Sequence, residues 1–262
     1  MDKRYRVAVA GCHRMTSPQL AGHNFAAAFA AVEQTDIVAV FDRGEETRAD
    51  FVACWGTVVS YADYDRMLQE VQPDILCIAT RQTMHADQIE AAVAAGVRGI
   101  FCDKPLATSL VEMDRILTVC SNGQVPLLFA LDRRWMASYQ RLRLLIQEDI
   151  IGAVTSITAY GLPNLINHGC HWYDTALMLV GDPEPQWVSG FVADMDAEPS
   201  DSRRRLDPPG QGQVGLSNGA TLTIAPDGGG RPAFTLVGEA GRLFVLHDAT
   251  QTFLWTEARG ME

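Results

Sequence analysis

The sequence predicts an α/β protein, with a doubly wound parallel sheet at the N-terminus followed by a C-terminal α+β domain whose sheet is mainly antiparallel. Two observations predict this fold class. Apolar strand-like runs alternate with helical segments over residues 1–124, and strand patterns dominate from about residue 154 onward. We therefore expect a first domain at residues 1–124 and a second, smaller one at residues 125–262.

Short connections separate the elements expected in the first domain. Its strands are expected at residues 5–10, 36–41, 58–60, 75–79 and 99–102, and its later helices at 45–55, 64–71, 86–95 and 109–120. For the first helix, Ser17-Pro18 is a favourable start, and an Ala/Phe-rich segment continues it from Gly22 to Val32. Alternation of this kind implies right-handed crossovers between parallel strands. It is the Rossmann-like arrangement, in which ligands bind beyond the carboxyl ends of the strands.

Strands outnumber helices in the second domain. The strands are expected at residues 125–131, 154–160, 187–193, 213–216, 220–224, 234–237, 242–247 and 253–256, and the helices at 139–147 and 171–180. Ser217-Asn218-Gly219 is a hairpin signal. The polar segment 196–212 is interpreted as a mobile surface loop.

Composition limits the classes of function. The formal net charge of −11 argues against a nucleic-acid surface, which needs a basic footprint. No apolar run reaches the length of a membrane span, and the start of the sequence has no signal-peptide pattern. Six cysteines without a CxxC pair are typical of buried thiols in a reducing compartment, so a cytoplasmic location is expected.

The first candidate site is the turn after the first strand, Gly11-Cys12-His13-Arg14-Met15. Dinucleotide-binding folds place G-x-G-x-x-G here, so that backbone amides approach a pyrophosphate at a helix N-terminus. Only Gly11 of that pattern is present, His13 stands in the second glycine position, and the turn is too long. The alternative is a strand-to-helix connection that binds nothing.

Two further strand ends carry polar residues suited to a cofactor cleft. Asp42 closes the second strand, where a carboxylate accepts from ribose hydroxyls and favours NAD, whereas the adjacent Arg43 suits the phosphate of NADP. Thr80, Arg81 and His85 follow the central strand. The alternatives are an exposed loop aspartate at Asp42 and a helix-start residue at His85.

The run Gly99–Cys102 leads directly into Asp103-Lys104-Pro105. It predicts a short buried strand with a lysine at its carboxyl end. Such a lysine either takes part in ligand chemistry or is a solvated loop charge.

A second polar cluster precedes the helix expected near residue 171. With a helix start near Asn167, the side chains of Asn167 and His171 would share one face, and Asp174 would follow three positions later. A histidine oriented by neighbouring polar groups is the usual general acid/base, while the alternative is a satisfied core histidine. His168 and Cys170 are poorly spaced to join His171 in a zinc site, and we predict no metal.

Several motifs, in this order along the chain, resemble the glucose–fructose oxidoreductase / inositol dehydrogenase (Gfo/Idh/MocA) family of sugar and cyclitol dehydrogenases. The resemblance runs from Arg6 to about Phe244. The motifs are Ala8-Val9-Ala10-Gly11-Cys12, Val38-Ala39-Val40-Phe41-Asp42, Tyr61-Ala62-Asp63-Tyr64, Pro73-Asp74-Ile75, Ile78-Ala79-Thr80 with His85, Asp103-Lys104-Pro105-Leu106-Ala107, Gly169-x-His171-x-x-Asp174 and Val237-Gly238-Glu239-Ala240-Gly241-Arg242-Leu243.

The resemblance implies an NAD-dependent oxidoreductase, with NADP possible, acting on a hydroxyl or carbonyl of a sugar, cyclitol or related polyol. Its Glu-Lys-Pro hallmark falls on Asp103-Lys104-Pro105, which gives Lys104 the role of polarising the reacting oxygen, and its acid/base histidine falls on His171. The residues implied to bind the cofactor are Gly11, His13, Arg14, Met15, Asp42, Arg43, Thr80, Arg81, His85, Asp103 and Lys104. Asn167 and Asp174 are the implied companions of His171. Relatives associate through the second sheet, so a homo-oligomer is expected.

The chain also departs from the family pattern. Many members carry an aspartate where this chain has Asn167, although asparagine also occurs there, and the second domain is short. The substrate pocket is therefore expected to be more open, or to be completed by another subunit. Two alternatives stay open: a non-catalytic nucleotide- or sugar-binding regulator, and a redox-neutral enzyme that retains its NAD.

Overall fold

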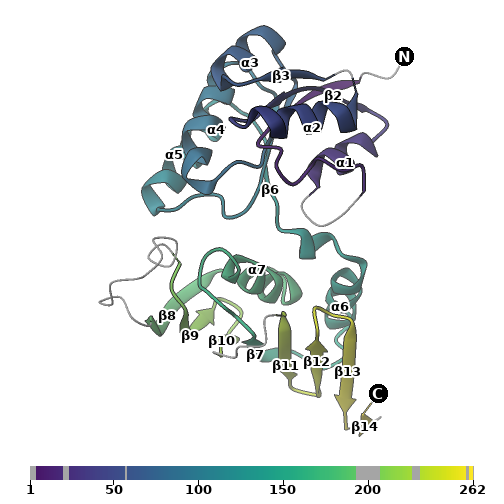
Figure 1. Ribbon diagram of the computed structural model, residues 1–262. Coiled ribbons are helices and arrows are strands. Elements are labelled where there is room, and N and C mark those ends of the chain that lie inside the picture. Colours follow the sequence, from purple (N-terminus) through teal and green to yellow (C-terminus); the bar gives the residue numbers. More distant parts are fainter. Residues whose placement is uncertain are drawn as a thin grey trace. The chain divides into compact units, whose positions relative to one another are not determined.

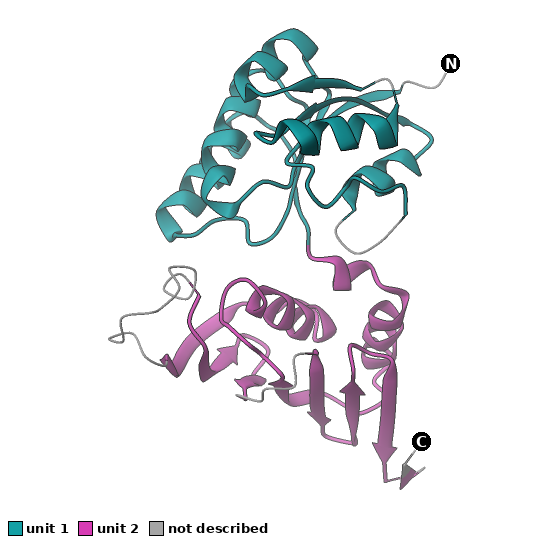
Figure 2. Ribbon diagram, in the orientation of Figure 1, with its two compact units in different colours: residues 1–130 teal, residues 131–262 magenta. Residues whose placement is uncertain are grey.

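We analysed a computed structural model, which describes residues 4–19, 24–56, 58–192, 207–225, 231–257 and 260–261 (Figure 1). The chain divides into two compact units, Met1–Ala130 (unit 1) and Leu131–Glu262 (unit 2), coloured separately in Figure 2. Gly22 and most of the expected loop 196–212 lie outside the described residues.

Unit 1 is built on a six-stranded sheet of order β3-β2-β1-β4-β5-β6 in which every pair is parallel. The strands are β1 (Tyr5–Ala10), β2 (Thr35–Phe41), β3 (Val59–Tyr61), β4 (Ile75–Ile78), β5 (Gly99–Cys102) and β6 (Leu127–Phe129). The strand order reverses between β1 and β4. In doubly wound sheets the crevice at this reversal is the ligand-binding position.

Helices cover both faces of this sheet (Figure 1). They are α1 (Phe25–Ala30), α2 (Glu45–Trp55), α3 (Tyr64–Val71), α4 (His85–Ala94) and α5 (Leu110–Asn122), with a short 3₁₀ turn, η1 (Gln82–Met84). Met67, Ile89 and Ile116 bring α3, α4 and α5 into one core, and Ala26 and Phe51 bring α1 and α2 into the other. Because both faces are buried, the strands are apolar almost throughout rather than alternating.

Two expectations for unit 1 were wrong. Ser17-Pro18 lies in a bend, and the first helix begins only at Phe25. The strand expected to open the second domain is β6, whose Leu127–Phe129 pair with Ile100–Cys102 of β5. The division between the units therefore falls after Ala130, six residues beyond the expected position 124.

Unit 2 confirms the mainly antiparallel sheet, whose strand order is β14-β13-β12-β11-β7-β10-β9-β8. Among the described residues, only the pair of β7 and β10 is parallel. The strands are β7 (Val154–Tyr160), β8 (Pro185–Val192), β9 (Gly210–Leu216), β10 (Thr221–Ile224), β11 (Ala233–Gly238), β12 (Gly241–Leu246), β13 (Gln251–Thr256) and β14 (Gly260–Met261). The predicted turn at Gly219 joins β9 to β10 with a positive φ of 86°.

Helices α6 (Ala137–Gln147) and α7 (Gly169–Leu179) pack on one face of this sheet, and a 3₁₀ turn, η2 (Asp132–Trp135), precedes them. Tyr139 and Trp172 enter the core with Ile157, Phe234 and Leu243 of the sheet. The strand alternation points these sheet residues inward and leaves their neighbours on the opposite, outer face.

All six cysteines are free thiols. In the part of the chain that the structure describes, the helices are too short or too polar to span a bilayer.

Candidate active site

The carboxyl end of β1 turns at Gly11, which packs directly against the end of β4. Its φ is +84°, and a Cβ atom there would lie 2.7 Å from the backbone of Ala79 and Thr80. Both the left-handed conformation and the close approach require glycine. Gly11 therefore sets the β1 turn at the point where the strand order reverses.

The rest of this turn divides into an exposed and a buried part. His13 and Arg14 are exposed, whereas Met15 is only 1% exposed and belongs to the core that includes Phe51. The Met15 carbonyl accepts a hydrogen bond of 2.7 Å from the Trp55 indole. Met15, predicted to contact the cofactor, therefore has its side chain in the core and anchors the turn instead.

Asn24, which the sequence analysis did not single out, organises the entry to α1. Its side-chain oxygen accepts from the Ala27 amide at 3.0 Å, and its side-chain nitrogen donates to the carbonyls of Ser17 and Gln19. Asn24 is 4% exposed. The asparagine thus caps the helix and holds the preceding loop, which explains why the helix does not start at Pro18.

Asp42 at the end of β2 fastens two turns together. One carboxylate oxygen accepts from the Cys12 amide at 3.0 Å and the other accepts from the Gly44 amide at 2.9 Å. Burial, reinforced by Asp42, raises the pKa of the Cys12 thiol to about 12, so that thiol is neutral and unreactive at physiological pH. Arg43 is exposed beside this carboxylate.

The end of β4 brings the expected residues Thr80, Arg81 and His85 into different environments. Arg81 is exposed, and the Thr80 hydroxyl donates to the side-chain oxygen of Gln88. His85 is 1% exposed, with Nδ1 3.2 Å from the Leu106 carbonyl oxygen and Nε2 3.3 Å from that of Thr80. Burial lowers its pKa despite these two acceptors. His85, predicted to face a cofactor, is instead a buried link between the loops after β4 and β5.

Lys104 lies at the carboxyl end of β5, as predicted. The Asp103 amide donates to the Ile78 carbonyl at 2.8 Å, which continues the pairing with β4, and the Asp103 carboxylate accepts from the Lys104 amide at 2.8 Å. Asp103 is 9% exposed and Lys104 is half-buried. The Lys104–Pro105 peptide bond is cis. Asp103 therefore serves the backbone of this turn, while Lys104 lies at the ligand-binding edge of the sheet.

Four cationic side chains follow the ends of adjacent strands: Arg14 after β1, Arg43 after β2, Arg81 after β4 and Lys104 after β5. They gather at one edge in a chain whose net charge is −11. A cationic edge beside a carboxylate, Asp42, matches the chemistry of a dinucleotide, which combines a diphosphate with ribose hydroxyls. The residues of this edge therefore fit NAD(P).

In unit 2, α7 begins at Gly169, so Asn167 precedes the helix. The carboxylate of Asp207 accepts from the amides of Ile166 and Asn167 at 2.6 and 2.8 Å and holds the approach to the helix. Asn167 therefore lies outside the helix, and its partnership with His171 stays a prediction. His171 lies in the first turn of α7 and is 7% exposed.

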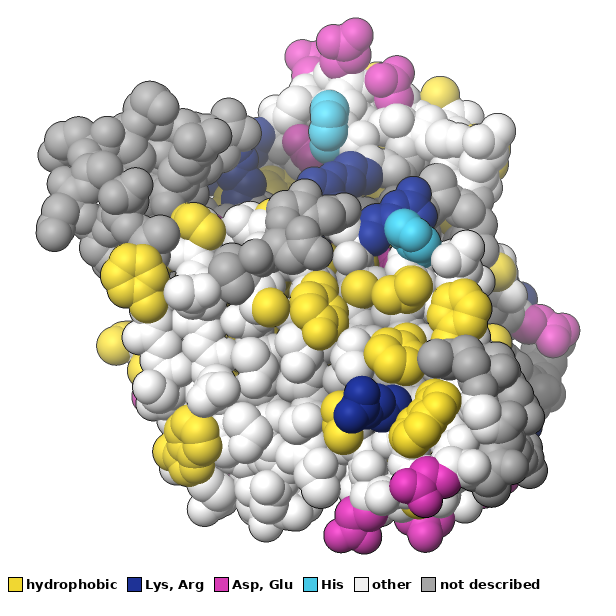
Figure 3. Space-filling model, turned by 90° about the horizontal axis from the view of Figure 1, so that it is seen from below, with side chains coloured by type: hydrophobic (Ala, Val, Ile, Leu, Met, Phe, Trp, Pro, Cys, Tyr) yellow, Lys and Arg dark blue, Asp and Glu magenta, His cyan; other side chains and the backbone are white. Residues whose placement is uncertain are grey.

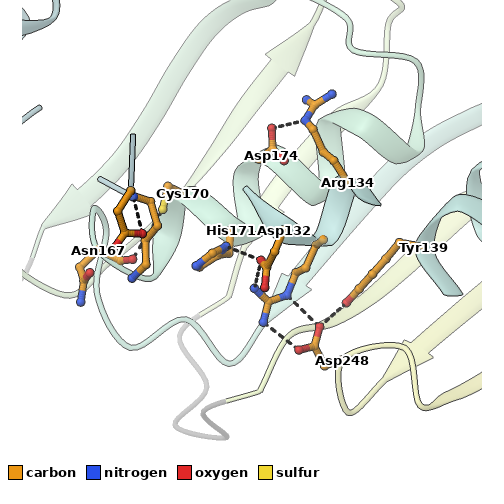
Figure 4. Close-up of polar contacts among 11 residues, drawn as sticks. Asp132, Arg134, Tyr139, Asn167, Cys170, His171, Asp174 and Asp248 are labelled. Atoms are coloured by element: carbon orange, nitrogen blue, oxygen red, sulfur yellow. Dashed lines mark hydrogen bonds and ion pairs between the residues drawn. The ribbon is translucent and has the colours of Figure 1, made fainter. Parts of the chain in front are cut away.

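A carboxylate that the sequence analysis did not single out lies beside His171 (Figure 4). The Nδ1 atom of His171 is 3.5 Å from Oδ1 of Asp132 in η2. The side chain of Asp132 is 66% exposed. Asp132 comes directly after the apolar run that ends at Leu131. The same strand-end position indicates Asp42 and Lys104 as candidate site residues, and it indicates Asp132 equally well.

Asp174 faces away from this pair (Figure 4). Its Oδ1 atom accepts from Nε of Arg134 at 2.6 Å, and Arg134 also binds Asp182 at 2.6 Å. Burial raises the pKa of Asp174, and Arg134 opposes that shift. Asp174, predicted to accompany His171, instead forms an ion pair with Arg134 that joins α7 to η2.

Arg133, the next residue after Asp132, is held by a separate set of hydrogen bonds. Its Nε and Nη2 atoms donate to the two oxygens of Asp248 at 2.8 and 2.7 Å, and the Tyr139 hydroxyl donates to Asp248 at 2.9 Å. The guanidinium also lies 6.0 Å from the ring centre of Trp172. These contacts tie η2 to α6, α7 and the loop after β12.

The described residues contain no group of three or more His, Cys, Asp or Glu side chains arranged to hold a metal ion.

Comparison with known proteins agrees with this geometry. A family model described as "Oxidoreductase family, NAD-binding Rossmann fold" (GFO_IDH_MocA) matches residues 5–130, which is nearly the whole of unit 1. Unit 1 of the chain matches the Gfo/Idh/MocA family model. The resemblance inferred from the sequence motifs is thereby confirmed, and the specific roles of individual site residues stay predictions.

Among curated relatives, the D-apiose dehydrogenase of Paraburkholderia graminis is 28% identical over 197 residues, covering 69% of this chain and 51% of that protein. The trans-1,2-dihydrobenzene-1,2-diol dehydrogenase of Xenopus tropicalis is 22% identical, covering 68% of this chain and 60% of that protein. The chain thus spans roughly half the length of the first of these relatives and three fifths of the second.

Solved structures share the fold over almost the whole chain. An oxidoreductase from Agrobacterium radiobacter, in complex with NAD⁺, L-tartaric acid and magnesium, has a TM-score of 0.81 at 18% identity, covering 99% of this chain and 79% of its own. The WlbA dehydrogenase of Bordetella pertussis, in complex with NADH and UDP-GlcNAcA, has a TM-score of 0.78 at 21% identity, covering 93% of this chain and 78% of its own. The fold of this chain is therefore shared with these solved structures.

Proposed function

We propose that the protein is an NAD(P)-dependent oxidoreductase acting on a hydroxyl or carbonyl of a sugar, cyclitol or related polyol. The observation that carries this proposal is Lys104, a half-buried cation at the carboxyl end of β5 in a family Rossmann domain. Curated relatives named as apiose and inositol dehydrogenases support the substrate class. A cytoplasmic location stays a prediction.

Arg14, Arg43 and Arg81 are the groups of this chain suited to the cofactor phosphates, and Asp42 is suited to a ribose. Asp42 favours NAD, because its carboxylate would repel a ribose phosphate, while the exposed Arg43 leaves NADP use open. The cofactor, when bound, supplies the hydride acceptor or donor.

Lys104 is proposed to stabilise the charge of the reacting oxygen, and His171 is proposed to transfer its proton. The ammonium group of Lys104 stabilises negative charge that develops on that oxygen during oxidation. The imidazole of His171 takes the hydroxyl proton and returns it in the reverse direction. A variant of this chemistry, in which the hydride returns to the same molecule, would make the reaction redox-neutral.

The test starts with cofactor binding. Calorimetric titration with NAD, NADH, NADP and NADPH should show binding at millimolar concentration or better for at least one of them. Lys104→Ala should then lower kcat by about 10²-fold or more on an aldose or inositol that the wild type oxidises, with cofactor affinity retained. Lys104→Arg is the matched control that keeps the charge. Absence of binding to all four cofactors would overturn the proposal and favour the non-catalytic regulator.

We further propose that the protein forms a homo-oligomer through the outer face of the unit 2 sheet. Phe244 and Phe253 pair directly on this face, and Arg242 lies 6.0 Å from the ring centre of Trp255 beside them. At the other end of the sheet Trp187 is 50% exposed and its ring lies on Gly215. Figure 3 shows hydrophobic side chains gathered on the lower side of unit 2. A second copy of the chain would cover these aromatic groups.

A further inference from the structure

We propose that Asp132 is the positioning residue of His171: its carboxylate keeps the proton of the neutral ring on Nδ1 and balances the charge of the imidazolium. This inference rests on the proposed function, because it assigns a helper to the acid/base of that reaction. The positioning role is thus given to Asp132 of η2, and not to Asn167 or Asp174, the polar neighbours of His171 in sequence.

The carboxylate of Asp132 lies next to one nitrogen of the His171 ring. Nδ1 of His171 lies 3.5 Å from Oδ1 of Asp132, which is within ion-pair distance and longer than an ordinary hydrogen bond. A carboxylate at Nδ1 favours the tautomer that holds its proton on Nδ1. In that tautomer the basic lone pair is on Nε2, which is then the atom able to accept a proton from a substrate hydroxyl.

The second step excludes the neighbours in sequence. Asn167 precedes α7, its backbone is held by Asp207, and a neutral amide cannot balance an imidazolium as a carboxylate does. Oδ1 of Asp174 is held by Arg134 at 2.6 Å. Asp132 is thus the carboxylate recorded beside the His171 ring among the described residues.

The third step concerns the charge of Asp132. Its other recorded contact is Nη1 of Arg133 at 3.5 Å, but Nε and Nη2 of Arg133 bind Asp248 at 2.8 and 2.7 Å. Asp248 therefore accepts the two short hydrogen bonds of the Arg133 guanidinium, and the charge of Asp132 remains available to His171. The side chain of Asp132 is 66% exposed, so it is also in contact with water.

The proton balance follows from this arrangement. During oxidation the substrate O–H bond breaks and its proton forms a new N–H bond at Nε2, while the hydride leaves the carbon for the cofactor. His171 is then an imidazolium whose Nδ1–H faces Asp132, and Asp132 stays unprotonated. In reduction the Nε2 proton returns to the oxygen.

The decisive measurement needs neither cofactor nor substrate. In long-range ¹H–¹⁵N spectra of the unliganded protein, His171 should show the Nδ1–H tautomer above its titration range. Asp132→Leu should shift the ring toward the Nε2–H tautomer, whereas the exposed-acid control Glu184→Gln should leave it unchanged. An unchanged tautomer in a folded Asp132→Leu protein, checked by circular dichroism, would overturn the inference.

Asp132→Asn is the second variant, because it keeps the acceptor oxygen and removes only the charge. It should retain the Nδ1–H tautomer while lowering kcat by about 10- to 100-fold, with KM changed less than about twofold. Equal kcat values for this variant and the wild type would also overturn the inference. If no cofactor binds at all, the proposed function fails, and the tautomer measurement still decides the role of Asp132.

Discussion

His85 shows how one buried side chain makes the stability of unit 1 depend on pH. Burial lowers its pKa from the ordinary value of 6.5, so at mildly acidic pH the unfolded chain binds a proton that the folded protein excludes. The free energy of unfolding should therefore fall as the pH drops below about 6.5 toward the folded pKa.

We expect His85→Gln to weaken this dependence. Urea unfolding at pH 7.5, 6.5 and 5.5 would measure it, with the difference in unfolding free energy between wild type and variant shrinking as the pH falls. A constant difference across the three pH values would contradict the assignment. Glu184→Gln, a change at an exposed acid, is the control for general effects of substitution.

Single residues were the least predictable part of the site. The sequence identified Gly11, Asp42, Lys104 and His171 from strand ends and motif spacing, and the structure places each of the first three at a strand end. Met15 and His85 were assigned to the cofactor, yet both are buried, since neighbours distant in sequence surround them. Asp132 follows an apolar run, as Asp42 does, but its proximity to His171 comes from the tertiary fold, because the two residues are remote in sequence.

At the scale of elements, two glycines with positive φ allow the cost of backbone strain to be measured apart from the cost of a steric clash. Gly96→Ala places a side chain at a φ of +83° with nothing within 4 Å, and it should lower the unfolding free energy by about 1–2 kcal/mol. Gly11→Ala has a similar φ of +84°, but its Cβ would lie 2.7 Å from the β4 backbone.

Gly11→Ala should therefore destabilise the protein by at least about 2 kcal/mol more than Gly96→Ala, because the two strand ends must separate. Chemical denaturation of both variants measures the difference. Equal losses would mean that β1 and β4 do not approach each other as described, and would also weaken the placement of the cofactor edge.

Elements were more predictable than residues where the local signals were strong. The strands of both units followed their apolar patterns, and Ser109 caps α5 through its hydroxyl, which accepts from the Glu112 amide. The local signal at Ser17-Pro18 was misleading, since Asn24 holds that segment outside the helix through two side-chain hydrogen bonds. Local helix propensity does not include hydrogen bonds that a residue further along the chain makes to the same segment.

At the scale of the whole molecule, the outer sheet face leads to a prediction about association. Phe253 is 42% exposed there, so Phe253→Asp should weaken self-association by placing a charge among Phe244 and its neighbours. Leu117→Asp on α5, where the leucine is 53% exposed, is the matched control and should leave the oligomer intact.

Sedimentation velocity from micromolar to millimolar concentration measures both variants. A wild-type protein that sediments as a monomer throughout would contradict the proposed oligomer. Equal weakening by both substitutions would place the interface elsewhere.

The pairing of β7 has a consequence for the order of events during synthesis. This strand, Val154–Tyr160, lies between β10 and β11, which begin at Thr221 and Ala233. Every sheet partner of β7 therefore leaves the ribosome long after β7 itself, whereas the sheet of unit 1 is complete in sequence at Phe129. Contacts between distant segments form slowly because the intervening chain must first be ordered. We expect nascent chains to acquire a folded unit 1 first, and to leave β7 open to chaperones until the last strands emerge.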